Sequence, residues 1–275
     1  MTLRTEKIPS LNKILKEASK TSILDMSEEI IKLIRPMLNT KFIQIPLIDM
    51  DGLEDGYLGF RYVIKEFKYD RYKKFILDTI DDQENGDLVF DKLVNEFIKT
   101  KVAPEVDAMR ICTYAKVGEA NGNKGDAIDL STQPASVIME ELSKAMDFMD
   151  EAEVPAEGRI LFIASSVYGV LEDMNLMESR AVLSRFEQII EVPQSRMNMD
   201  VQLTNNGFTV DPAKKINFLI ARKDAVIQIP KHVAPEYLSS SRNPDADAHV
   251  YTYRTLQLAE VREGKESHIY VSAMA

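Results

Sequence analysis

The stretch from Asp81 to Lys92 has residue types that suit a calcium-binding loop, because acidic and amide side chains surround Gly86 at its sixth position. Such a loop needs an oxygen ligand at its third position and a bidentate glutamate at its twelfth. Gln83 stands at the third position and Lys92 at the twelfth, and a lysine cannot ligate a cation. We therefore expect no calcium here.

The other candidates for catalytic or ligand chemistry lack partners at the required spacing. The loop glycines Gly118, Gly122 and Gly125 do not have phosphate-binding spacing, and no Gly-Lys-Ser/Thr follows them. The histidines are scattered, and no Gly-x-Ser-x-Gly motif accompanies them; they are His232, His249 and His268. The paired Asp49 and Asp51 have no identifiable base or metal partner.

The single cysteine, Cys112, excludes an intrachain disulfide and a cysteine-based zinc site. We interpret it as a small buried apolar residue of a helix. The sequence thus predicts no catalytic residue, no cofactor and no metal, and the chain is not expected to be an enzyme.

Composition limits the classes that remain. The 275 residues are 45% hydrophobic and 28% charged, which is typical of one large or two modest domains with a real core. A net charge of −10 argues against broad DNA binding through the surface. The longest uncharged run, Ile160 to Leu171, is shorter than the about 18 residues of a membrane span. The charged amino terminus is not typical of a signal peptide.

The stretch from Leu58 to Ile80 predicts a charged β-hairpin, and we expect its basic side chains to be what this protein presents to a partner. Both arms are rich in aromatic and branched residues, and the expected tip is Tyr69-Asp70. A lone two-stranded ribbon is marginally stable in water, so it needs a surface to lie on. We predict contact with another subunit through its basic side chains, Arg61, Lys65, Lys68, Arg71, Lys73 and Lys74. Solvation of these charges is the alternative.

A long helix is predicted directly after this hairpin. Apolar residues recur at three- and four-residue spacing and define one buried face. Pro104 cannot donate to the carbonyl of Thr100, so a kink or restart is expected there. The predicted core of this helix consists of Phe90, Leu93, Val94, Phe97, Ile98, Val102 and Val106.

The remaining chain alternates helix and strand. Residues 1–40 contain two amphipathic stretches, which form either two short helices on the main body or an arm that reaches a neighbour. A helix is expected around Val137–Met149, with an acidic face that includes Glu140, Glu141 and Asp147 and that we interpret as solvated. Strands are expected at Ile160–Ala164, between Phe186 and Ile229, and on both sides of Glu263-Gly264.

The segment Gln83 to Arg110 resembles the start of the long spine helix in major capsid proteins of tailed bacteriophages. In many of these proteins a basic extended loop leads into a helix of the pattern F…(T)KV-x-PE-(I/V)-D-A-x-R. The matching residues here include Phe97, Lys101, Pro104, Glu105, Asp107 and Arg110. Gly158–Met174 and Asn243–Ala273 match the same family more weakly, so the resemblance covers most of the chain from about Lys41 onward.

This resemblance implies the α+β fold of tailed-phage major capsid proteins, the HK-ninety-seven-like fold that is shared with encapsulin shells. It implies an N-terminal arm, an extended β-hairpin loop, a peripheral domain with the spine helix, and an axial domain. The predicted ranges are, in that order, 1–56, 57–82, 83–126 with 224–275, and 127–223.

The function implied is that of a structural shell subunit of a phage or prophage. It would self-assemble through pentamers and hexamers into an icosahedral capsid that encloses double-stranded DNA. Expected partners are further copies of the chain, a portal protein, a scaffolding protein, and packaged DNA bound without sequence specificity. We expect the virion as location, after assembly in the host cytoplasm, and no membrane. The alternatives are an encapsulin-like nanocompartment shell and a soluble α+β enzyme with an unrecognised site.

Overall fold

The computed structural model describes residues 3–36, 41–49, 59–78, 88–172, 182–233, 237–238, 243 and 248–274. The chain forms two compact units, which we describe separately. Unit 1 comprises Met1–Asn12, Asp25–Val89 and Gln228–Leu258. Unit 2 comprises Lys13–Leu24, Phe90–Ile227 and Ala259–Ala275.

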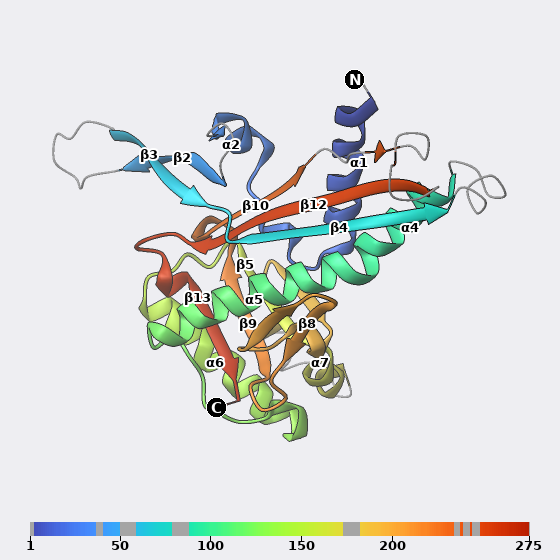
Figure 1. Cartoon of the computed structure of the whole chain (residues 1–275). Coiled ribbons are helices and arrows are strands. Elements are labelled where there is room, and N and C mark those ends of the chain that lie inside the picture. Colours follow the sequence, from blue (N-terminus) through green and yellow to red (C-terminus); the bar gives the residue numbers. More distant parts are fainter. Residues whose placement is uncertain are drawn as a thin grey trace. The chain divides into compact units, whose positions relative to one another are not determined.

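Unit 1 contains a three-stranded antiparallel sheet of β1 (Arg35–Pro36), β2 (Phe42–Asp49) and β3 (Gly59–Glu66), in that order (Figure 1). β2 and β3 form a hairpin whose register runs from Phe42↔Glu66 to Asp49↔Gly59. Side chains alternate between the two faces of a strand, and Ile43 and Ile45 of β2 are buried. One face of this hairpin is therefore buried against the rest of unit 1.

A second sheet of unit 1 is built around the long strand β12 (Ala248–Val261), together with β10 (Val226–Val233) and β11 (Tyr237–Leu238). β4 (Tyr69–Asp78) pairs antiparallel with β12, from Tyr69↔Gln257 to Asp78↔Ala248. In Figure 1 the two strands run side by side as long cyan and red arrows.

The predicted hairpin of Leu58–Ile80 is therefore wrong. Its arms are strands, but β3 pairs with β2 and β4 pairs with β12. Only Phe67 and Lys68 link the two arms, and the Phe67 side chain is buried, so the chain passes here from one sheet to the other. The predicted tip, Tyr69-Asp70, instead starts β4. β3 thus pairs with the strand that precedes it, and β4 pairs with a strand far along the chain.

The amino-terminal residues form α1 (Leu3–Ala18), the short η1 (Ser22–Leu24) and α2 (Glu28–Leu33). Leu11 and Leu15 of α1 are buried, as its helical spacing predicts. α2 has no buried residue, and its Leu33 is 52% exposed. The interpretation as two helices packed on the body thus holds for α1 and fails for α2 within this single chain.

Unit 2 is a three-layer structure around a mixed sheet of order β13-β9-β5-β6. The strands are β5 (Arg159–Ala164), β6 (Gln188–Val192), β9 (Ile216–Arg222) and β13 (Ile269–Ala273). β5 is buried along its whole length and β9 over all but its last residue, which is expected when helices cover both faces of a sheet.

Two helices provide these outer layers, α5 (Ala103–Ala120) and α6 (Ala135–Glu151). A Cβ atom on Gly118 of α5 would lie 3.4 Å from the side chains of Ile269 and Val271, at ordinary contact distance, so α5 lies directly against β13. Tyr270 points to the other face, where its ring lies 5.4 Å from that of Phe148 of α6. The main hydrophobic core fills the space between these layers.

Shorter elements complete unit 2. They are η3 (Leu130–Thr132), α7 (Ser165–Glu172), η4 (Gln194–Arg196), β7 (Val201–Thr204), β8 (Gly207–Val210), η5 (Lys223–Ala225) and η7 (Glu266–His268). The predicted strand segment between Val201 and Val210 is a two-stranded hairpin, β7–β8.

The predicted long helix is confirmed, and its irregularity lies just before Pro104. α4 (Leu88–Phe97) continues through a π-helical turn (Ile98–Val102) into α5. The Ala103 N–H donates to the Ile98 carbonyl five residues back. The Thr100 hydroxyl donates to the Glu96 carbonyl at 2.7 Å. The wider turn accommodates a proline, which has no N–H and whose ring would clash with an ordinary α-helical carbonyl.

The buried face of this helix is narrower than predicted. Val94, Ile98, Val102 and Val106 are buried, but Leu93 is 40% exposed and Phe97 is half-buried. Leu93 and Phe97 each precede a buried residue by one position, which places them about 100° away around the helix. Leu93 is therefore wrongly assigned to the core of this chain, and the side chain of Phe90 lies outside the described residues.

The compact units do not follow the predicted domain limits. α5 and the range 127–223 belong to one unit, because β13 packs on α5 and pairs with β9. The division into arm, extended loop, peripheral domain and axial domain stays a prediction.

Candidate assembly surfaces and motif residues

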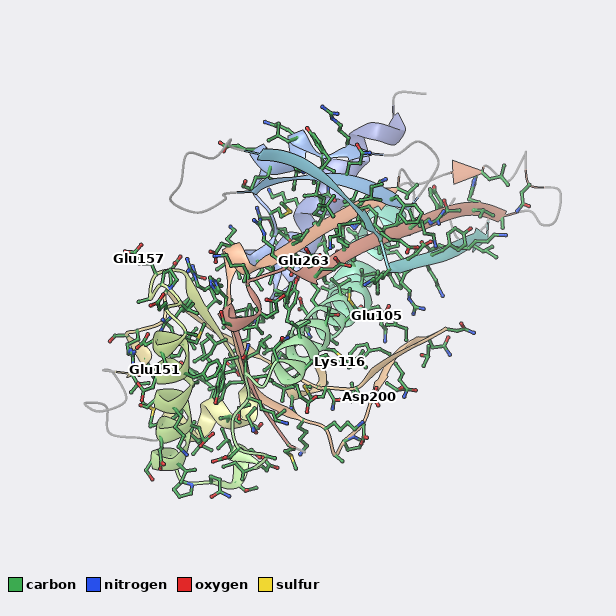
Figure 2. The ribbon with its side chains drawn as sticks, turned by 90° about the vertical axis from the view of Figure 1, so that its left-hand side faces the viewer. Glu105, Lys116, Glu151, Glu157, Asp200 and Glu263 are labelled. Atoms are coloured by element: carbon green, nitrogen blue, oxygen red, sulfur yellow. The ribbon has the colours of Figure 1, made fainter. Side chains whose placement is uncertain are left out.

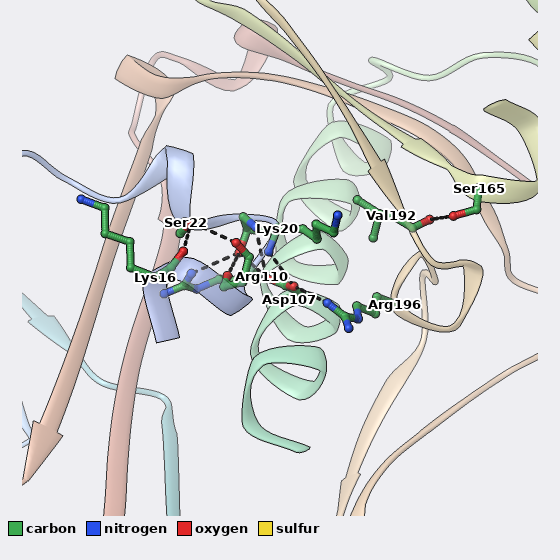
Figure 3. A network of polar contacts seen from close by, with 10 residues as sticks. Lys16, Lys20, Ser22, Asp107, Arg110, Ser165, Val192 and Arg196 are labelled. Atoms are coloured by element: carbon green, nitrogen blue, oxygen red, sulfur yellow. Dashed lines mark hydrogen bonds and ion pairs between the residues drawn. The ribbon is translucent and has the colours of Figure 1, made fainter. Parts of the chain in front are cut away.

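Asp107, in the motif that resembles the capsid spine, is the centre of a buried polar network in unit 2 (Figure 3). Its side chain is fully buried. The carboxylate accepts from Ser19 Oγ at 2.6 Å, from Thr21 Oγ1 at 2.8 Å and from the Lys20 N–H at 2.9 Å. The Arg196 guanidinium lies 3.0 Å away and supplies the opposite charge.

The neighbouring motif residues are also structural. Arg110 is 1% exposed, and its Nη1 donates to Thr21 Oγ1 at 3.1 Å. Glu105 is 5% exposed. Buried charges require such partners, because desolvation is costly. The motif therefore fastens the segment Ser19–Thr21 and η4 to the spine helix.

Asp70 lies at the base of the β2–β3 hairpin in unit 1, between two cations. Arg254 of β12 donates to both carboxylate oxygens of Asp70, at 2.8 and 2.7 Å, and Lys41 Nζ lies 2.7 Å away. The hydrogen bond from Arg254, and then that from Lys41, lower the pKa of Asp70 to about 2, against the opposing effect of burial. Lys41 immediately precedes β2, and its carbonyl accepts from the Phe67 N–H at 2.9 Å just after β3.

The outward face of the β2–β3 hairpin carries exposed apolar side chains beside Gln44 and Glu66. Phe42 is 40% exposed, Tyr62 37% and Ile64 55%. The register pairs Tyr62 with Pro46 and Ile64 with Gln44, so these side chains share a face with Phe42. The Arg35 guanidinium lies 4.3 Å from the centre of the Tyr62 ring. An exposed apolar sheet face of this kind is suited to contact with another protein.

The six basic residues predicted for subunit contact do not share one ribbon. Arg61 and Lys65 are on β3, and Lys68 is in the link. Arg71, Lys73 and Lys74 are on β4, where Lys73 and Lys74 are exposed. The side chain of Arg61 lies outside the described residues. These six cations are divided between two sheets, because β3 and β4 pair with different strands.

The acidic face predicted for α6 is mostly exposed. Among its residues, Asp147, Glu151 and Glu153 are exposed, and Glu151 is labelled in Figure 2 with Glu157 and Lys116, which are exposed too. Glu141 was wrongly assigned to this solvated face. It is 2% exposed and accepts from Lys144 Nζ at 2.8 Å, because it lies beneath the segment that contains Gly125 and Asp126.

Among the described residues, no group of three or more histidine, cysteine, aspartate or glutamate side chains is placed to hold a metal. Asp51 and most of Asp81–Lys92 lie outside those residues. One hollow beside Lys124 and Met274 has a volume of about 60 Å³, whereas ligand pockets usually measure about 300–1,000 Å³. Cys112 is buried, and its thiol donates to the Met199 carbonyl. None of the described helices is long and apolar enough to cross a membrane.

We expect His232 to make the stability of the protein depend on pH. It is 5% exposed, and its Nε2 lies 3.2 Å from the Tyr253 hydroxyl. Burial lowers the pKa of His232 to about 4. An unfolded histidine has a pKa of about 6.5, so between these values the unfolded chain binds a proton that the folded chain does not. We expect the free energy of unfolding to fall as pH decreases from about 6.5 to about 4.

Urea unfolding at a series of pH values measures this slope. His232→Phe should reduce the slope, because it removes the titrating group. It should not abolish the slope, since burial also lowers the pKa of His268. An unchanged slope in His232→Phe would contradict the assignment.

Comparison with known proteins identifies the fold. No protein-family model matches the sequence, and no curated protein matches it. Solved structures do match over most of the chain. The mature capsid of bacteriophage PhiM1 aligns with a TM-score of 0.56 and 12% identity, covering 87% of this chain and 83% of that chain. The capsid of cyanophage P-SCSP1u aligns with a TM-score of 0.53 and 13% identity, covering 88% and 85%.

The chain has the fold of phage capsid proteins. A virus-like particle from Pyrococcus furiosus also aligns, with a TM-score of 0.53 and 14% identity over 100% of both chains. The capsid fold predicted from the spine motif is thus confirmed. The motif residues Asp107 and Arg110 make buried contacts within this fold. The strand pairing differs from the prediction, because β3 pairs with β2 and β4 pairs with β12.

Proposed function

We propose that this protein is the major capsid protein of a tailed phage or prophage, a structural subunit that assembles with further copies of itself into a closed shell. The capsid fold over nearly the whole chain carries this proposal. It is supported by the apolar outer face of the β2–β3 hairpin, since side chains such as Ile64 need a covering partner. We propose a structural rather than a catalytic role.

The finer parts of the proposal follow from the same role. Pentamers and hexamers would build an icosahedral capsid around double-stranded DNA, with a portal and a scaffolding protein as partners, and the mature subunit would reside in the virion. The exposed cations Lys68, Lys73 and Lys74 are proposed to contact neighbouring subunits. Surface ion pairs contribute about 0–1 kcal/mol each, so the apolar hairpin face is the stronger candidate contact.

Electron microscopy and sedimentation of the concentrated protein test this function. We expect closed shells, or rings of subunits, with or without a co-expressed scaffolding protein. Ile64→Ser should fold as the parent does by circular dichroism but lose shells, because among the described residues it removes the most exposed apolar group of the hairpin face. Leu203→Ser is the matched control, because Leu203 is an exposed aliphatic residue of β7, 43% exposed. Only monomer at every protein and salt concentration, with scaffold present, would refute the proposal.

A second candidate is the shell of an encapsulin-like nanocompartment, which the full-length alignment with the Pyrococcus particle supports. The content of purified shells separates the two functions. Packaged nucleic acid supports a phage capsid, and a co-purifying enzyme supports a nanocompartment.

A further inference from the structure

The β2–β3 hairpin is held by its buried inner face, at Ile43 and Ile45, and by the contacts at its base. β2 and β3 pair with each other, and among the described residues β1 adds the pairs Arg35↔Gln44 and Pro36↔Ile43. Its outer face is exposed at Phe42, Tyr62 and Ile64. A small sheet with one open face is marginally stable on its own. The contacts where it joins the second sheet therefore act together with this buried face on the angle at which the hairpin leaves that sheet.

Three described contacts meet at that base. The Phe67 N–H donates to the Lys41 carbonyl and closes the open end of the hairpin. The Phe67 side chain is 2% exposed, with Lys231 Nζ 5.6 Å from the ring centre. Asp70, on the second residue of β4, joins Lys41 on the hairpin side to Arg254 on the β12 side.

The chemistry of this cluster suits a positioning role better than a stabilising one. Arg254 and Lys41 have side chains 43% and 48% exposed, so solvent screens much of their attraction for Asp70. The two-point contact between Arg254 and Asp70 nevertheless fixes the orientation of both groups, because guanidinium and carboxylate are planar. The Lys41 ammonium binds the Asp70 carboxylate, so the position of that carboxylate fixes the residue directly before β2.

We propose that Asp70 is a positioning residue, which sets the direction of the β2–β3 hairpin through Lys41 and Arg254 and which a subunit needs in order to close onto its neighbour. The second half of this statement rests on the proposed shell function. The first half concerns unit 1 alone and is tested separately.

The single native cysteine is buried, so spin labels can be placed by substitution. Ile64→Cys on the hairpin and Ile76→Cys on β4 are 55% and 63% exposed positions of the same unit. Double electron–electron resonance between them should give one narrow distance in the parent. Asp70→Asn and Lys41→Met should lose that single distance and give a broad distribution. Lys41→Arg should retain it, because it keeps the cation.

Lys74→Gln is the matched control, since Lys74 lies exposed on the same strand and none of the ion pairs found among the described residues involves it. If Asp70→Asn does not fold, Lys41→Met decides alone, because Lys41 is half-exposed and its loss leaves the β4–β12 pair intact. A narrow, unshifted distance in Lys41→Met and in any folded Asp70→Asn would overturn the proposal.

The requirement of Asp70 for closure onto a neighbouring subunit is tested by shell yield at equal concentration of folded subunit. These variants carry no spin labels and keep the native residues at positions 64 and 76. Asp70→Asn should lose shells while Lys116→Gln, at an exposed lysine of α5 outside the proposed contacts, keeps them. A parent-like yield despite a broadened distance would overturn the requirement for closure. If the parent protein itself forms no shell, the proposed function fails, and the distance measurement still decides whether Asp70 sets the hairpin direction.

Discussion

Replacing Asp107 with alanine is expected to lower the free energy of unfolding by about 3–5 kcal/mol, the range found when one partner of a buried ion pair is removed. The substitution leaves Arg196 without its opposite charge. It also removes the acceptor for Ser19, Lys20 and Thr21. Urea unfolding of the unassembled subunit measures the change, with the protein concentration held constant.

Asp147→Ala is the matched control, because its carboxylate is 73% exposed and faces Arg185 at 3.8 Å on the surface. It should change the free energy of unfolding by less than about 0.5 kcal/mol. A double-mutant cycle of Asp107→Ala with Arg196→Met then isolates the ion pair from the hydrogen bonds. Equal unfolding energies for Asp107→Ala and Asp147→Ala would show that the network contributes nothing.

Ile98→Ala is expected to cost about 2–5 kcal/mol, because it removes buried methyl and methylene groups and leaves a cavity. Ile98 is fully buried at the start of the π-helical turn, where the surrounding spine has little freedom to collapse. Thermal and urea unfolding of the subunit give the value.

Leu93→Ala on the same helix is the comparison, since Leu93 is 40% exposed in the single chain. It should cost much less than Ile98→Ala in the unassembled subunit. A larger loss for Leu93→Ala would mean that the buried face has been assigned to the wrong side of the helix.

The elements of this fold follow from local sequence patterns, whereas their partners do not. The apolar runs of β5 and β9 and the spacing of α5 and α6 predict strands and helices, because burial dictates their residue types. Strand pairing is set by contacts between distant segments. Two short β-rich runs in succession favour a local hairpin, and nothing in the Phe67-Lys68 link indicates that it leads into another sheet.

The same limit applies to the sites. The spine motif singles out Asp107 and Arg110, but their partners Ser19 and Thr21 are 86 to 89 residues away and have no pattern of their own. Asp70 was assigned to the tip of the predicted hairpin, between the two β-rich runs. Its true partner, Arg254, lies 184 residues away, and the sequence analysis missed both Arg254 and Lys41. Charge alone cannot pair residues that the fold brings together.

The π-helical turn of the spine adds one residue to this helix just before Pro104 and keeps its buried side chains on one face. Buried side chains recur every four residues at Val94, Ile98, Val102 and Val106. In a regular helix each four-residue step overshoots one turn by about 40°, and three steps would carry the last residue off the face of the first. The π-helical turn has more residues per turn, so the second step, from Ile98 to Val102, covers less than one full turn. The buried residues therefore stay on one face, as they would in a regular helix with one inserted residue.

Removing one residue between Ile98 and Val102 would therefore keep the buried residues in phase. It would also restore a tight turn in front of Pro104, whose ring then meets the carbonyl four residues earlier. The inserted residue and the proline belong together. A shell protein that has this spine one residue shorter should carry another amino acid at the position of Pro104.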